Sequence, residues 1–130
     1  MSRILIAAEY QTLDAVGAEL EKDGHDVVSM QMTLDGSPSM WIRAISKIQE
    51  EVWDVVILAS TFKDEDDNNS HGPAEEIIAT SIRKGVSKII VAKGIPVKDQ
   101  FSREIMGIRI VDLTKGHTLA SIREILDEAV

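Results

Sequence analysis

The sequence has no cysteine, and this absence removes several kinds of chemistry at once. Without a thiol there is no disulfide framework, no thiolate metal site and no cysteine nucleophile. A chain that needs no disulfides fits a reducing compartment.

Long apolar runs are also missing, since no stretch approaches the roughly 20 residues needed to span a membrane. The first residues lead directly into a strand-like pattern, which leaves no room for a signal peptide. We therefore expect a cytoplasmic protein with no membrane partner.

Basic residues are scarce, because 14 lysines and arginines face 22 acidic residues, giving a net charge of −8. Such an acidic surface aids solubility and argues against nonspecific binding to DNA or anionic lipid. We expect no nucleic-acid partner. The 130 residues suggest a single domain, residues 1–130, with a core of its own.

Apolar runs do alternate with longer amphipathic segments. Predicted helices follow Thr12, begin at Ser37-Pro38 and at Gly72-Pro73, and include the last apolar stripe from Leu119 to Leu126. Gly24 and Gly85 are the predicted stops of the first and third of these helices. Continuous apolar strands separated by helices are typical of a parallel sheet covered on both faces. We predict an α/β fold, a three-layer flavodoxin-like sandwich whose five-stranded parallel sheet has the order 2-1-3-4-5. The predicted strands are residues 4–8, 27–30, 55–58, 88–92 and 108–113, and residues 100–106 form a short helix with little helical pattern.

Glycine-rich phosphate loops are absent. There is no Gly-x-Gly-x-x-Gly and no Walker motif. The turn after the first strand lacks the Ser/Thr-rich loop expected of flavodoxins, and Glu9 there disfavours a phosphate. The Asp-x-His-x-x-Gly of cobalamin-binding domains is missing as well. We predict no cofactor.

The third strand has a polar start and a buried run, residues 53–59 (WDVVILA). It resembles the third strand of response-regulator receiver domains, which has the form x-Asp-hydrophobic-run-Asp. In that family the last Asp accepts a phosphoryl group from a histidine kinase. Here Ala59 stands at that position, and a methyl group cannot be phosphorylated.

Other positions resemble the receiver family in part. The first strand of receivers ends in two acidic residues that hold Mg²⁺, whereas this chain has Ala8 followed by Glu9. Lys115 matches the lysine that contacts the phosphoryl group, although Gly116 replaces the usual proline. The Ser/Thr that ends the fourth strand has no match. Phosphoryl transfer needs a carboxylate, a metal and a cation together, so the resemblance implies a pseudo-receiver that lacks receiver chemistry.

Two functions follow from this pattern. One is a non-catalytic signalling or scaffold module that binds a protein partner or forms a homodimer and is not phosphorylated by a histidine kinase. The alternative is a small-ligand protein or enzyme that binds a nucleotide or phosphate beyond the carboxyl ends of the strands. We lean against an enzyme, and we predict no catalytic residues and no metal site. The residues that line the expected vestigial pocket are Glu9, Ala59, Ser60, Thr61, Lys93 and Lys115.

Some polar residues have simpler interpretations. Glu9 and Lys115 can form an ion pair that caps the sheet. The acidic segment 63–71 has oxygen ligands for a cation but no complete EF-hand spacing, and a solvated loop is the simpler reading. Ser60 and His71 lack the surroundings of a nucleophile and its base. We place His25 at the surface and both tryptophans, Trp41 and Trp53, in or beside the core.

Overall fold

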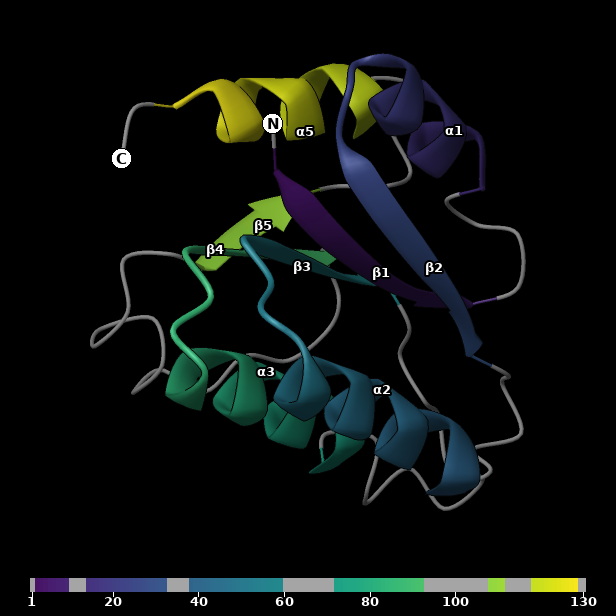
Figure 1. Cartoon of the computed structure of the whole chain (residues 1–130), viewed down its shortest axis with the longest axis vertical. Coiled ribbons are helices and arrows are strands. Elements are labelled where there is room, and N and C mark those ends of the chain that lie inside the picture. The colour runs from purple at the N-terminus through teal and green to yellow at the C-terminus, as the bar shows by residue number, and fades with distance from the viewer. Residues whose placement is uncertain are drawn as a thin grey trace.

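Figure 1 shows the computed structural model, which describes residues 2–9, 14–32, 38–59, 72–92, 108–111 and 118–128. Strands and helices alternate along the chain until the last two strands, β4 and β5, which follow one another among the described elements. In chain order the elements are β1 (Arg3–Glu9), α1 (Asp14–Lys22), β2 (Asp26–Met32), α2 (Pro38–Glu50), β3 (Val55–Ala59), α3 (Gly72–Arg83), β4 (Lys88–Ala92), β5 (Ile108–Val111) and α5 (Thr118–Asp127).

The strands form one sheet with the order β2-β1-β3-β4-β5, and every neighbouring pair is parallel. β1 lies inside the sheet, where Leu5 pairs with Val28 on one side and with Val56 on the other. This arrangement confirms the predicted flavodoxin-like topology. It also brings the carboxyl ends of all strands to one edge of the sheet, because parallel strands share a direction.

Helices cover both faces of the sheet. α1 and α5 lie on one face, and α2 and α3 lie on the other (Figure 1). The layers explain why the central strands read as continuous apolar runs: side chains that alternate between the two faces are buried on both. All five residues of β3 are buried, and Ile4, Leu5 and Ile6 of β1 are at most 2% exposed. Burial of each such large aliphatic side chain stabilises the fold by roughly 1.5–3 kcal/mol.

Two glycines end the helices that lead into β2 and β4. Gly24 and Gly85 have φ angles of 98° and 75°, in the left-handed region that favours glycine. The N–H of Gly24 donates to the carbonyl of Glu21, and the next N–H, of His25, donates to Leu20. The same pair of bonds follows α3, which identifies both as Schellman motifs. The sequence prediction that helices stop at these glycines is confirmed.

Boundaries differ slightly from those predicted. β2 extends one residue before and two residues after the predicted 27–30, because its backbone pairs with β1 as far as Glu9. β5 is described from Ile108 to Val111, and the rest of the predicted strand lies outside the described residues, as does the predicted helix 100–106. Among the described helices, none combines the length and apolar character that a membrane crossing requires.

Candidate functional site

The carboxyl ends of the strands form the edge where sequence patterns predicted a pocket. β1 ends at Glu9, β3 at Ala59 and β4 at Ala92, on three neighbouring strands. Ala8 pairs directly with Ala59 in the ladder between β1 and β3. Both side chains are nearly buried, at 7% and 8% exposure. Two methyl groups therefore stand side by side at the centre of this edge.

Most of the other predicted pocket residues cannot be placed around these alanines. Ser60, Thr61, Lys93 and Lys115 lie outside the described residues, and Glu9 is described only as the last residue of β1. The suggested Glu9–Lys115 ion pair therefore stays a prediction. The acidic segment 63–71 and His71 also lie outside the described part of the chain, and Trp41 is described only as part of α2.

Asp54, the polar residue that precedes β3, lies at the opposite end of this strand from Ala59. Its Oδ2 accepts a hydrogen bond of 2.8 Å from the backbone N–H of Arg3. Its own N–H donates to the Arg3 carbonyl at 2.9 Å, and its carbonyl accepts from the N–H of Lys88 at 3.2 Å. Asp54 thus joins the starts of three strands. At about 3.3 Å per residue it is about 16 Å from the position of Ala59, too far to place its carboxylate at the carboxyl edge of the sheet.

A charged cluster surrounds Trp53 at this amino end of the sheet. The guanidinium of Arg3 lies over the indole ring, 4.6 Å from its centroid, and forms an ion pair with Glu51. The indole N–H donates to the Lys47 carbonyl at 3.0 Å, and the Lys47 ammonium lies 2.8 Å from Glu51 Oε2. The Lys47 ammonium, and then the Arg3 guanidinium, lower the pKa of the Glu51 carboxyl. Trp53 is 4% exposed, which confirms its predicted place in the core.

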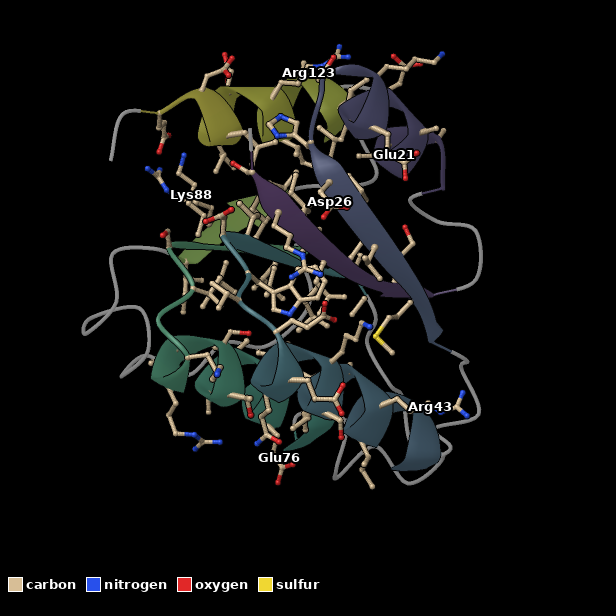
Figure 2. All side chains as sticks on the ribbon, viewed as in Figure 1. Glu21, Asp26, Arg43, Glu76, Lys88 and Arg123 are labelled. Carbon is tan, nitrogen blue, oxygen red and sulfur yellow. The ribbon has the colours of Figure 1, made fainter. Side chains whose placement is uncertain are left out.

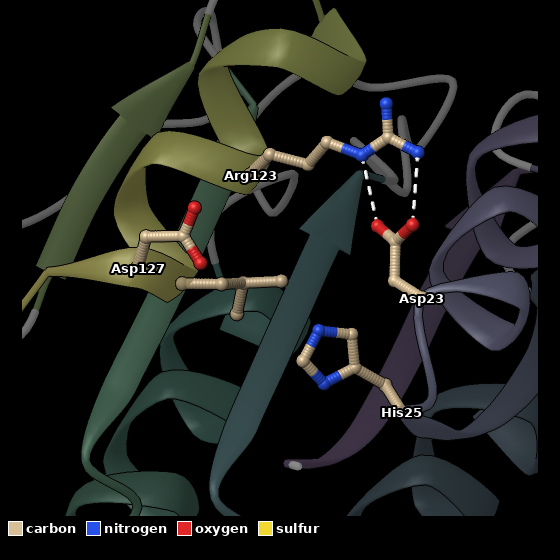
Figure 3. A pocket seen from close by; sticks show the side chains of 5 residues that line it. Asp23, His25, Arg123 and Asp127 are labelled. Carbon is tan, nitrogen blue, oxygen red and sulfur yellow. Dashed lines mark hydrogen bonds and ion pairs between the residues drawn. The ribbon is translucent and has the colours of Figure 1, made fainter.

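A second polar cluster lines a shallow cavity of about 460 Å³ between the α1–β2 turn and α5. Asp23, His25, Arg123, Leu126 and Asp127 line it (Figure 3). Arg123 donates to both carboxylate oxygens of Asp23, at 2.8 and 3.1 Å. These bonds lower the pKa of Asp23 and raise that of Arg123.

His25 does not lie on the open surface, as the sequence analysis placed it. It is half-buried, and its Nδ1 accepts a hydrogen bond of 3.0 Å from the backbone N–H of Ser2. The Schellman turn at Gly24 directs it there, and only the neighbouring glycine hinted at this in the sequence. Its acceptor nitrogen is occupied by the backbone, and Asp23 and Arg123 bind each other, so neither His25 nor Asp23 is free to act as a general base here.

Residues that lie far apart in sequence build both clusters, which is why sequence patterns did not reveal them. Arg3 and Glu51 are separated by 48 positions, and Asp23 and Arg123 by 100. Neither cluster provides a metal centre: among the described side chains, no three His, Asp or Glu residues come together as ligands.

Comparison with known proteins adds no relative. No protein-family model matches the chain, and no curated protein matches its sequence.

Proposed function

We propose that the chain is a non-catalytic pseudo-receiver, a signalling or scaffold module that acts by binding a protein. On this proposal the domain keeps the architecture of a receiver but has no phosphoryl-transfer chemistry, so a histidine kinase does not phosphorylate it.

The observation that carries the proposal is the pair Ala8 and Ala59. In the resemblance to receivers, Ala59 occupies the phosphoacceptor position and Ala8 one of the two positions that hold Mg²⁺. The two residues are partners in the β1–β3 ladder, and both are nearly buried. Attack on a phosphoryl donor needs a nucleophilic oxygen and a cation that neutralises the developing charge. Methyl groups provide neither.

The overall topology supports the same proposal. The order β2-β1-β3-β4-β5 is the one that receivers share with other flavodoxin-like proteins. Fold alone does not imply function, so the proposal depends on the two alanines and on the motif in which they stand.

An NMR titration tests the proposal directly. Backbone amide resonances of the protein are followed while Mg²⁺ and beryllofluoride, a phosphoryl mimic, are added, and then with nucleotides and FMN. We expect no saturable shifts at Glu9 and Ala59. Separate titrations with MgCl₂ and with sodium fluoride measure the resonance shifts that the added salts cause by themselves.

Saturable shifts at these residues with one nucleotide, or with FMN, would overturn the proposal. Such a result would favour the alternative, a small-ligand protein or enzyme that uses the carboxyl-end pocket. Saturation with beryllofluoride would mean that phosphoryl-like chemistry survives without the missing carboxylates.

A further inference from the structure

The two edge strands of the sheet differ in how well they are protected. β5 is described over four residues, and its exposed Arg109 forms an ion pair with Glu128. β2 has seven residues, as many as β1, and contains neither lysine nor proline. Short strands, charges and prolines are the usual means of preventing an edge from pairing with another chain. By these criteria Arg109 protects β5 within its described residues, whereas the single charge of β2, Asp26, lies at its start and leaves the rest of that strand without charge.

The outer side of β2 presents free backbone groups. The N–H of Asp26 donates to the Ser2 carbonyl of the neighbouring chain segment at 3.0 Å. Successive residues of a parallel strand bond to opposite sides, so Asp26, Val28 and Met30 bond to β1. Val27, Ser29 and Gln31 therefore direct their N–H and carbonyl groups outward. In the described part of the chain, no strand pairs with that side.

Apolar side chains of β2 are also incompletely covered. Val27, Val28 and Met30 are only half-buried, and Ser29 is exposed. A Cβ added at Gly17 of α1 would lie 3.4 Å from Ser29 Oγ and 3.8 Å from Val27, so these two side chains lie on the α1 face. Val28 and Met30 then lie on the opposite face, the side of α2 (Figure 1).

We propose that this edge is a self-association surface, on which β2 of a second copy pairs antiparallel about a twofold axis at Ser29. Ser29 then faces Ser29 of the second copy, and Val27 faces Gln31. Each of these facing residues has outward backbone groups, so each pair exchanges two hydrogen bonds, about six in all.

The side chains fit the same register. Val28 faces Met30 of the second copy, which brings two half-buried apolar side chains together on the α2 face. Asp26 faces Met32, so no like charges are directly opposed. A twofold axis uses the same surface on both copies, and the strand is complementary to itself in this one register.

This surface goes beyond the proposed function, because it depends on the outer edge of β2 and not on the carboxyl ends of the strands. A strand pair alone buries less than the roughly 1,600 Å² of a standard interface. We therefore expect a dimer that dissociates on dilution.

Engineered cysteines test both the dimer and its register, since the chain has no thiol of its own. In Ser29→Cys the two Cα atoms lie about 5.5 Å apart across the twofold axis, within reach of a disulfide. In the control, Val27→Cys, they lie about 13 Å apart, since four residues along the strand separate them. Mild oxidation should yield a covalent dimer of the first variant and not of the second, alongside a reversible dimer of the unmodified protein in sedimentation equilibrium.

Proline at the axis tests the backbone pairing. Ser29→Pro removes an N–H that pairs with no strand in the described part of the chain, so the fold should persist, as proline is tolerated on an outward-facing edge. The dissociation constant of the dimer should increase by about tenfold or more, because two hydrogen bonds between the copies are lost. Ser29→Ala keeps the N–H and should dimerise as the unmodified protein does. If Ser29→Pro fails to fold, Ser29→Lys serves instead, since two lysines would face each other at the axis.

A protein that stays monomeric at the concentrations used for NMR would overturn the proposal. So would a dimer that Ser29→Pro and Ser29→Lys leave intact, or equal crosslinking of the two cysteine variants, since either result would locate the interface elsewhere. None of these three outcomes depends on whether the carboxyl-end edge of the sheet binds a phosphoryl mimic.

Discussion

Ala8 of β1 and Ala59 of β3 are direct partners in a parallel ladder, and their methyl groups fill the centre of the carboxyl edge. They lie 7% and 8% exposed, so this part of the edge is closed and apolar. A charged group introduced there must be partly desolvated, and this raises the free-energy cost of placing a carboxylate at either position.

On the pseudo-receiver proposal, we predict that Ala59→Asp alone is not stably phosphorylated, because Ala8 leaves one of the expected Mg²⁺ positions without a carboxylate. The buried carboxylate should also lower the free energy of unfolding by about 2 kcal/mol. Acetyl phosphate and Mg²⁺ are added, and intact-mass spectrometry measures phosphorylation. The double variant Ala8→Asp with Ala59→Asp restores both carboxylates and is the informative comparison. Robust labelling of the single variant would contradict our account of the missing parts.

Two glycines should respond to alanine in opposite ways. Gly85 has a φ of 75°, so Gly85→Ala should lower the free energy of unfolding by about 1 kcal/mol through backbone strain, although the space around its Cβ is open. Gly17 lies inside α1, where alanine is favoured by about 1 kcal/mol, and its added Cβ would meet Ser29 Oγ at 3.4 Å. Gly17→Ala should therefore stabilise the protein. Urea denaturation of both variants measures the two changes, and a loss of stability in Gly17→Ala would mean that α1 packs too closely on β2 to accept a methyl group.

Features of this structure that depend on neighbouring residues could be predicted from the sequence, whereas contacts between residues far apart in the sequence could not. The apolar runs of β1, β3 and β4 and the glycine stops of α1 and α3 are local, and they predicted the strands, the helix ends and the strand order. The ion pair of Asp23 with Arg123 joins residues 100 positions apart, and His25 is held by the backbone of Ser2. No local pattern contains those contacts. The site stays partly untested, since Ser60, Thr61, Lys93 and Lys115 follow strand ends outside the described residues.

Trp53 contacts both the core and the charged cluster. We predict that Trp53→Phe separates the stability that comes from burial of the ring from the stability that comes from its polar contacts. Phenylalanine keeps most of the buried ring, but the Lys47 carbonyl loses its indole donor, which is 3.0 Å away. The ring under Arg3 also becomes a weaker cation–π partner. The free energy of unfolding should fall by about 1–2 kcal/mol.

A second variant at the same position measures the loss of stability when the whole Trp53 ring is removed. Trp53→Ala removes the whole ring and should cost about 3–5 kcal/mol. Equilibrium denaturation followed by circular dichroism compares the two variants without depending on tryptophan fluorescence. Equal losses would show that the polar contacts, and not the packed ring, dominate at this position.

Stability should fall in acid through two carboxylates. The pKa of Asp23 is lowered by Arg123, and the pKa of Glu51 by Lys47 and Arg3. A carboxyl with a lower pKa in the folded state binds fewer protons there than in the unfolded chain. Its stabilisation is complete above the ordinary carboxyl pKa values of about 4, and is lost as the pH falls through the folded-state values.

The double variant Asp23→Asn with Glu51→Gln should reduce this acid dependence. Melting temperatures measured from neutral pH to well below the ordinary carboxyl pKa of about 4 should fall less steeply in the variant than in the unmodified protein. The double variant Glu21→Gln with Glu50→Gln, which removes two exposed negative charges, is the control for net charge. An unchanged slope in the double variant would mean that these two ion pairs contribute nothing to acid stability.

The ammonium of Lys88 binds the C-terminal end of α5. Its Nζ donates to the carbonyls of Ile125, Leu126 and Glu128, at 2.6, 3.1 and 3.1 Å. Figure 2 shows Lys88 beside the C-terminal end of α5. One cation at the start of β4 thus binds carbonyls at and just beyond the end of α5, where helix carbonyls run out of partners in the helix; that of Ile125 also accepts from the N–H of Glu128 at 3.3 Å. The favourable interaction between a cation and the negative end of a helix dipole acts in the same direction.

The strand order also has a consequence for the time course of folding. No two neighbouring strands are joined by a hairpin, so every contact within the sheet requires closure of a long loop, and folding through such contacts is slow. β1, β2 and β3 are nevertheless consecutive in the chain and adjacent in the sheet, with β1 between the other two. We expect this three-strand block to form first and to present the free side of β3 as the template on which β4, and then β5, are added.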